Sequence, residues 1–241
     1  MEKQLHEAEG KGYPPEKIAR EIVVDLCTTY QNVTLYSDSF SLMKKYETHF
    51  DLNNVIVLNM MGRVYSNVMN YEKAKYFFEK AQKINLKIYG KYHETYVLNL
   101  KSLAFTYRQS KDYRKALELS IEALRVSIKI FGEESSETAI MKSNLSDTYV
   151  KTGDIMLAMK FSQEALNTAT NIFGDNNIQL TTYISNCATL NIYIGNFKTA
   201  KELLEKTLNI GRNYYGENHI ILATTYNNLS HFHEKDRKSV V

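Results

Sequence analysis

The sequence has few of the residues that interrupt helices. Its 241 residues include only two prolines, the adjacent Pro14 and Pro15. Because proline is the residue that most strongly disrupts a helix interior, the chain from Glu16 to Val241 carries nothing that forbids helix. This absence predicts an all-α body.

Cysteine and long apolar runs are equally scarce. Cys27 and Cys187 are too few and too far apart for a disulfide framework, and no Cys-x-x-Cys pair is present for zinc or redox chemistry. The polar N-terminus lacks the apolar core of a signal peptide, and no segment approaches the roughly 18 uncharged apolar residues of a membrane span. We therefore expect a cytoplasmic protein with no membrane insertion.

Motifs that carry chemistry are missing as well. The sequence has no phosphate-binding glycine loop, no His-Glu-x-x-His and no nucleophile elbow. His231 and His233 are two residues apart and so do not share a helix face. The net charge is only +3, with lysines alternating with glutamates, which is typical of solvated helix faces rather than of a phosphate-binding stripe. We expect no enzymatic activity, no catalytic residues, no metal, no cofactor and no nucleic-acid partner.

What the sequence does contain is a repeat. An aromatic–glycine pair recurs every 42 residues, and two small residues recur at the same period. The pairs are Tyr89-Gly90, Phe131-Gly132, Phe173-Gly174 and Tyr215-Gly216, and the small residues are Ala74, Ala116, Ala158 and Ala200, then Ala81, Ala123, Ala165 and Thr207. Small residues at a fixed phase predict close contacts between helices.

Each repeat is expected to hold two helices. Apolar residues at helical spacing mark both, and a polar residue stands at the start of every second helix: Asn70, Asp112, Asp154 and Asn196. The glycine of the aromatic–glycine pair then closes that helix, because glycine reaches a positive φ without a steric penalty.

This pattern resembles the tetratricopeptide repeat, in the 42-residue form of kinesin light chains. The unit Leu58-x-x-Met61-Gly62-x-x-Tyr65 followed by Ala74-x-x-x-Phe78-x-x-Ala81 is similar to the family signature, whereas the fourth unit has Asn191 in place of the tyrosine. The resemblance implies a right-handed α-solenoid of antiparallel helix pairs.

The repeat phase divides the chain into four expected parts. Residues 1–13 form a polar N-terminal tail, and residues 14–52 a degenerate helical pair or cap. Residues 53–220 hold four repeat units, and residues 221–241 a terminal half-repeat helix and tail.

In a stacked helical-pair solenoid the first helices line the concave side, so their exposed faces predict a peptide-binding groove. The predicted groove residues are Asn59, Arg63, Lys101, Phe105, Arg108, Asn144, Asp147, Lys151, Asn186, Tyr193 and Asn228, with Asn67, Ser102, Thr189 and His231 beside them. Asn144, Asn186 and Asn228 lie 42 residues apart and could hydrogen-bond a peptide backbone or, alternatively, satisfy groups between helices.

The groove residues also indicate the kind of partner. Arg63, Lys101, Arg108 and Lys151 make the groove basic, and Phe105 and Tyr193 offer apolar anchors. We expect a scaffold or adaptor whose protein partner supplies a segment with acidic residues and at least one bulky apolar residue. The carboxylate clamp of chaperone-binding relatives is disfavoured, because the matching positions hold Ile56, Met60, Ile140 and Asn144.

Two alternatives keep the same fold. In the first, the chain is a structural subunit that joins a larger assembly, or a second copy of itself, through the end of the solenoid at Leu222, Tyr226 and Leu229. In the second, it is a peptide-sensing regulatory domain.

Overall fold

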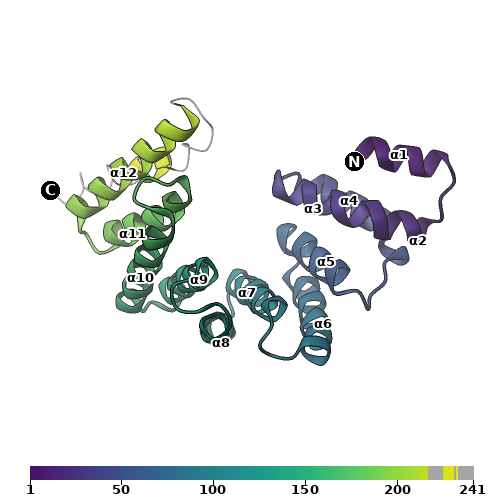
Figure 1. Ribbon diagram of the computed structural model, residues 1–241, viewed down its shortest axis with the longest axis horizontal. Coiled ribbons are helices and arrows are strands. Elements are labelled where there is room, and N and C mark those ends of the chain that lie inside the picture. Colours follow the sequence, from purple (N-terminus) through teal and green to yellow (C-terminus); the bar gives the residue numbers. More distant parts are fainter. Residues whose placement is uncertain (217–224, 231, 233–241) are drawn as a thin grey trace. The chain divides into compact units, whose positions relative to one another are not determined.

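The computed structural model describes residues 1–216, 225–230 and 232, and every regular element in them is helical (Figure 1). Residues 225–230 are helical too. The elements run in the order α1 (Glu2–Gly10), α2 (Pro15–Ile18), the π-helical turn η1 (Ala19–Val23), α3 (Val24–Asn32), α4 (Tyr36–Lys45), the 3₁₀ turn η2 (Glu47–His49), α5 (Val55–Asn67), α6 (Tyr71–Tyr89), α7 (Glu94–Gln109), α8 (Tyr113–Phe131), α9 (Ser136–Thr152), α10 (Ile155–Phe173), the 3₁₀ turn η3 (Ile178–Leu180), α11 (Thr181–Tyr193) and α12 (Phe197–Tyr215).

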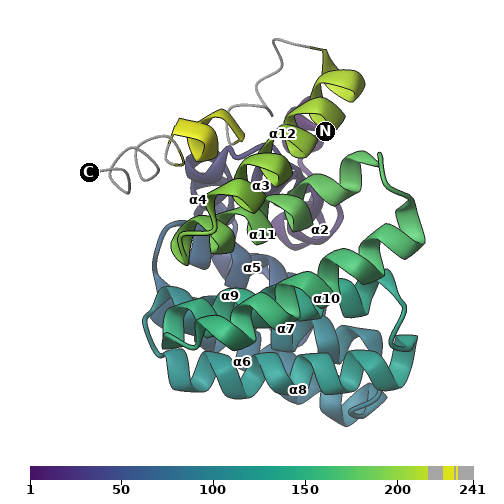
Figure 2. The same cartoon turned by 90° about the vertical axis from the view of Figure 1, so that its left-hand side faces the viewer.

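The predicted all-α class of stacked antiparallel helix pairs is confirmed. The chain forms two compact units, Met1–Leu119 and Ser120–Val241, which we call unit 1 and unit 2. In unit 1, α5 packs on α6 and α6 on α7. In unit 2, α9 packs along α10 (Figure 2), α10 on α11, and α11 on α12.

The periodic small residues lie at the helix contacts, as their phase predicts. Ala74 and Ala81 on α6 and Ala158 and Ala165 on α10 are fully inaccessible to solvent. A larger side chain at any of these positions would have to displace the neighbouring helix.

The side chains at three of the four expected N-cap positions accept a backbone hydrogen bond. The side chains of Asn70, Asp112 and Asp154 each accept a bond from the backbone amide three residues later, at 3.2, 3.1 and 3.4 Å. Asn196 stands at the N-cap of α12 as expected, but its side chain makes no cap hydrogen bond, and its amide donates instead to Asn191 Oδ1 at 2.9 Å. Asn191 occupies the position at which the other repeats carry a tyrosine. Its side chain is shorter than that of tyrosine, and its carbonyl oxygen accepts the hydrogen bond from Asn196.

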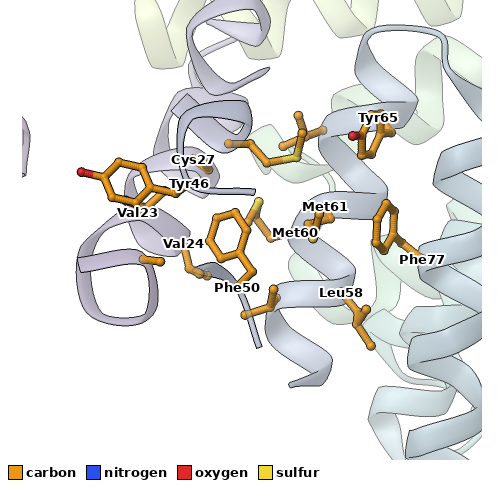
Figure 3. Packing of buried hydrophobic residues seen from close by; sticks show 14 of the residues in the cluster. Val23, Val24, Cys27, Tyr46, Phe50, Leu58, Met60, Met61, Tyr65 and Phe77 are labelled. Atoms are coloured by element: carbon orange, nitrogen blue, oxygen red, sulfur yellow. The ribbon is translucent and has the colours of Figure 1, made fainter. Parts of the chain in front are cut away.

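Aromatic and sulfur-containing side chains dominate the core of unit 1. In Figure 3, Phe50 lies beside Met60 at the start of the repeats, and Met61 points toward Phe77. Tyr65 stacks on Phe77 with ring centroids 5.5 Å apart. Burial of these large side chains joins the N-terminal helices to the first repeat.

The N-terminal segment differs from the expected polar tail. Residues 2–10 form α1, whose Leu5 and Ala8 are buried. Tyr46 Oη on the chain after α4 donates to Glu9 Oε1 at 2.5 Å, which ties α1 to the same unit. Two apolar residues among many charged ones gave too weak a periodic pattern to predict this helix.

Candidate functional site

The first helices of unit 1 place four of the predicted groove residues on one side. Arg63 lies four residues after Asn59 on α5, and Phe105 lies four after Lys101 on α7, so each pair shares a helix face. Since α5 and α7 contact each other, the two faces are continuous. We call the surface made by Ile56, Asn59, Arg63, Leu98, Lys101 and Phe105 the basic face.

Lys101 gives the basic face its charge. Its side chain is half-buried, and burial first, then the charge of Arg63, lower the pKa of its ammonium group. No carboxylate among the described residues pairs with it. Arg63 is exposed, and its guanidinium donates from Nη2 to Asn32 Oδ1 at 3.3 Å, a neutral partner. Two neighbouring cations without an acid between them create a positive potential at this surface.

Apolar side chains surround these cations. Phe105 is 44% exposed, and the Arg108 guanidinium lies 5.6 Å from its ring centroid. Ile56 and Leu98 are 68% and 51% exposed on the same faces of α5 and α7. Neither was predicted from the sequence to lie in the groove, although they stand 42 residues apart and that spacing could have revealed them.

The asparagines of unit 1 serve the packing between helices. Asn99 Nδ2 on α7 donates to Asn59 Oδ1 on α5 at 2.7 Å, and the side-chain amide of Asn85 on α6 donates to Asn99 Oδ1. The carbonyl of Asn59 is therefore occupied, whereas its amide hydrogens can still meet a ligand.

In unit 2 the predicted residues lie on α9 and α11. Asn144 and Asp147 are half-buried, and Lys151 and Tyr193 are exposed, Tyr193 by 69%. Asn186 Nδ2 on α11 donates to Ser143 Oγ on α9 at 3.0 Å. As in unit 1, an asparagine of one first helix bonds to the neighbouring first helix.

Asn186, Thr189 and Asn228 come together around one pocket of about 430 Å³. We call it the hydroxyl pocket, because hydroxyl groups dominate its wall. Its lining residues are Ile178, Thr181, Thr182, Ser185, Asn186, Thr189, Thr207, Gly211, Thr225 and Asn228. Its volume lies within the roughly 300–1,000 Å³ typical of small-ligand sites.

Of the residues predicted for an end interface, Tyr226 is exposed and Leu229 is partly buried. Tyr226 is 41% exposed, and its hydroxyl accepts a bond from Arg212 Nη2 at 3.2 Å. Leu229 packs against a core cluster of unit 2 that includes Leu204 and Phe232, so much of its side chain is already covered. Leu222 lies outside the described residues, as do His231 and His233.

Over the described ranges, no three His, Cys, Asp or Glu side chains converge in a way that could hold a metal ion. Cys27 and Cys187 are buried thiols. No helix in the described part of the chain has the length and apolar character needed to cross a membrane.

Comparison with known proteins finds one family profile, the tetratricopeptide repeat, which matches residues 53–129, 96–171 and 137–210. A comparison of the sequence with curated proteins finds no significant match.

Solved structures share the fold at low sequence identity. The structure of BtubC (BKLC) from P. vanneervenii is 19% identical with a TM-score of 0.69, over 89% of this chain and 92% of that one. Kinesin-light-chain-like repeats from Podospora anserina are 15% identical with a TM-score of 0.64, over 84% of this chain and 99% of that one. PH0952 from Pyrococcus horikoshii, a signal-transduction ATPase with a tetratricopeptide repeat sensor, is 19% identical with a TM-score of 0.63, over 84% of this chain and 32% of that one.

Proposed function

Because the chain belongs to the tetratricopeptide repeat family, we propose that it is a non-enzymatic scaffold or adaptor that holds a peptide segment of a partner protein on its first helices. Such repeats generally serve protein–protein interaction, and their stacked first helices present an extended surface. The basic face is the part of this surface on which we expect the peptide to be bound most strongly.

The observation that carries this proposal is the environment of Lys101. A half-buried ammonium group beside Arg63, with no carboxylate partner among the described residues, is held at a cost in desolvation that a bound acid would offset. The exposed side chains of Ile56, Leu98 and Phe105 beside it favour a bulky apolar group on the same ligand. The partner segment should therefore combine Asp or Glu with a large apolar residue.

Selection from a phage-displayed random peptide library tests this proposal. We expect the protein to enrich peptides that hold Asp or Glu within a few residues of Phe, Leu or Ile. The affinity of a synthetic enriched peptide, measured by fluorescence anisotropy, should fall about tenfold or more in Lys101→Glu, because a like charge then faces the acid of the ligand.

Lys83→Glu is the matched control, because Lys83 is an exposed lysine on α6, a second helix of the same unit. It makes the same change in net charge, and the affinity should change less than about twofold. Circular dichroism must show equal helix content in both variants. Enrichment of peptides without acidic residues, or equal losses in the two variants, would overturn the proposal.

The pH dependence provides an independent check. Because burial and Arg63 lower the pKa of Lys101, its positive charge is lost at a lower pH than that of an ordinary lysine. Affinity for the acidic peptide should therefore begin to fall before the usual lysine range of about pH 10 is reached.

The exposed ring of Tyr226 supports a second candidate, association through the end of the repeats. Under that alternative, Tyr226→Asp would lower the mass of the assembly measured by light scattering and leave peptide selection unchanged. Under the proposed function, Tyr226→Asp leaves both unchanged.

A further inference from the structure

The hydroxyl pocket of unit 2 is neutral, unlike the basic face. None of the described residues that line it is acidic or basic, and their polar groups are the hydroxyls of Thr and Ser and the amides of Asn186 and Asn228. A charged ligand group would lose its water here without gaining an opposite charge. The pocket is thus suited to an uncharged polar group.

Several of the donors in its wall are already in use. The hydroxyls of Thr181, Thr189 and Thr207 donate to backbone carbonyls of their own or the preceding helical turn, at 2.7, 2.9 and 3.0 Å. Asn186 Nδ2 donates to Ser143 Oγ at 3.0 Å. Each hydroxyl has a single hydrogen, so these threonine oxygens can only accept from a ligand, and Asn186 Oδ1 is likewise an acceptor.

The rest of the wall can complement them. Asn228 is half-buried and carries two amide hydrogens. Hydroxyl groups are carried by Thr182, Ser185 and Thr225. None of these four side chains donates to another described residue. The wall therefore offers both fixed acceptors and available donors. A group that fits must bear N–H hydrogens on one side and a carbonyl oxygen on the other, and the primary carboxamide has both.

We propose that the hydroxyl pocket receives the primary carboxamide of a Gln or Asn side chain from a peptide that lies along α11. This proposal rests on the proposed function, since it names a second feature of the bound peptide. A Glu side chain of the same length would bring a negative charge to the acceptors of Thr189, Thr207 and Asn186, and a Lys ammonium would be desolvated without a carboxylate. Selectivity against both follows from the same wall.

A titration with short peptides tests the proposal on the full chain. The probes are acetyl-Ala-Gln-Ala-amide and its Glu, Lys and norleucine counterparts, which share one backbone and differ only in the central side chain. With ¹⁵N-labelled protein, we expect the Gln peptide to shift the amide resonances of Thr189 and Thr207 at millimolar concentration. Its affinity should exceed that of each counterpart by about fivefold or more.

Variants of Thr189 give the sharper result. Thr189→Val removes an acceptor at an exposed position with almost no change of volume and should weaken the Gln peptide at least threefold, and Thr189→Ser should restore binding. Thr152→Val is the matched control, because Thr152 is also exposed and its hydroxyl donates to Tyr149 O at 3.1 Å, but it is not part of the pocket. It should leave the titration unchanged.

Equal binding of the norleucine or Glu peptide, shifts confined to residues away from α11 and α12, or no effect of Thr189→Val would overturn the proposal. Lys101→Glu lies in unit 1 and should not alter this titration. If the library selection enriches no acidic peptide but the Gln peptide still binds, only the proposal for the basic face is contradicted. If acidic peptides are enriched but the Gln peptide does not bind, only the proposal for the hydroxyl pocket is contradicted.

Discussion

The two units use the same repeat positions for different chemistry. The position of Lys101 in unit 1 corresponds to Ser143 and Ser185 in unit 2, and that of Phe105 corresponds to Asp147 and Thr189, at intervals of 42 residues. The buried alanines hold the helix pairs at fixed positions, and the exposed face of each first helix is then free to differ. The two units therefore share the alanine positions at which the helices pack, and they differ in the side chains at these two positions of the first helices.

The turns between paired helices differ between the units in a similar way. Met69 and Lys111 in unit 1 have φ values of 60° and 66°, and Gly153 and Gly195 at the matching positions of unit 2 have φ values of 88° and 79°. Only glycine adopts such a backbone without strain. Unit 1 therefore carries backbone strain at turns where unit 2 has glycine.

The largest effect is expected where Gly62 of α5 faces Phe78 of α6. A Cβ atom at Gly62 would lie 2.7 Å from the ring of Phe78, so in Gly62→Ala either the buried ring or the two helices must shift. The free energy of unfolding should fall by about 2–3 kcal/mol, measured by chemical denaturation.

Gly10→Ala is the control, since a Cβ there would meet nothing within 4 Å. Replacing Phe78 with Leu should recover part of the loss in Gly62→Ala, because it removes ring atoms from the contact. A full loss in the double variant would show that the contact is not the cause.

An ion pair of unit 2 that joins a buried lysine to a half-exposed glutamate is expected to produce the next effect. Lys142 Nζ lies 2.5 Å from Glu133 Oε1, and the lysine side chain is only 5% exposed. Glu133→Gln would leave this ammonium without its carboxylate, so the free energy of unfolding should fall by about 1–2 kcal/mol.

The double variant Glu133→Gln with Lys142→Met should regain most of that stability, because no buried charge then lacks a partner. Urea denaturation of the three variants measures this coupling. Equal stability of Glu133→Gln and the native sequence would contradict the role of the pair.

Smaller, opposite effects are expected at the turns. Met69→Gly or Lys111→Gly should raise the free energy of unfolding by about 0.5–1 kcal/mol, and Gly153→Ala should lower it by about 1 kcal/mol. Thermal unfolding of the three variants, scored against the unmodified protein, checks both signs. A destabilising glycine at Met69 would show that its side chain contributes more than its backbone strain costs.

Both units contain one buried thiol, and neither is expected to react while the protein is folded. Burial raises the pKa of Cys27 to about 12 and also raises the pKa of Cys187. At pH 8 both are protonated in the native state, so alkylation by iodoacetamide should be slow until urea is added. Because unfolded cysteine has a pKa of about 8.5, the folded state should lose stability as the pH rises above that value. Rapid labelling of either residue in the folded protein would contradict this.

The sequence alone predicted much of the fold, because the 42-residue spacing acts over many positions at once. Four copies of the alanine and glycine landmarks located the paired helices, whereas α1 has only Leu5 and Ala8 to mark it. Asn196 shows a different limit. Asparagine is a common N-cap residue, but the side chain of Asn196 bonds to Asn191 instead of to the first turn of α12. The spacing of N-cap residues in the sequence does not predict this bond.

The candidate site was predicted only in part. Helical spacing placed Lys101 and Phe105 on one face, but the bonds of Asn59 to Asn99 and of Asn186 to Ser143 join residues about 40 positions apart. Such pairings depend on how neighbouring helices pack. The wall of the hydroxyl pocket also includes Thr207 and Gly211 of α12, which no pattern on the first helices could identify.

A charge exchange at Lys101 tests most directly whether the basic face selects the ligand. The acidic peptide from the library selection and a copy with every Asp and Glu replaced by Lys would be titrated, by fluorescence anisotropy, against the native protein and Lys101→Glu. The account predicts that the native protein prefers the acidic peptide and that Lys101→Glu reduces or reverses this preference. An unchanged preference in Lys101→Glu would contradict it.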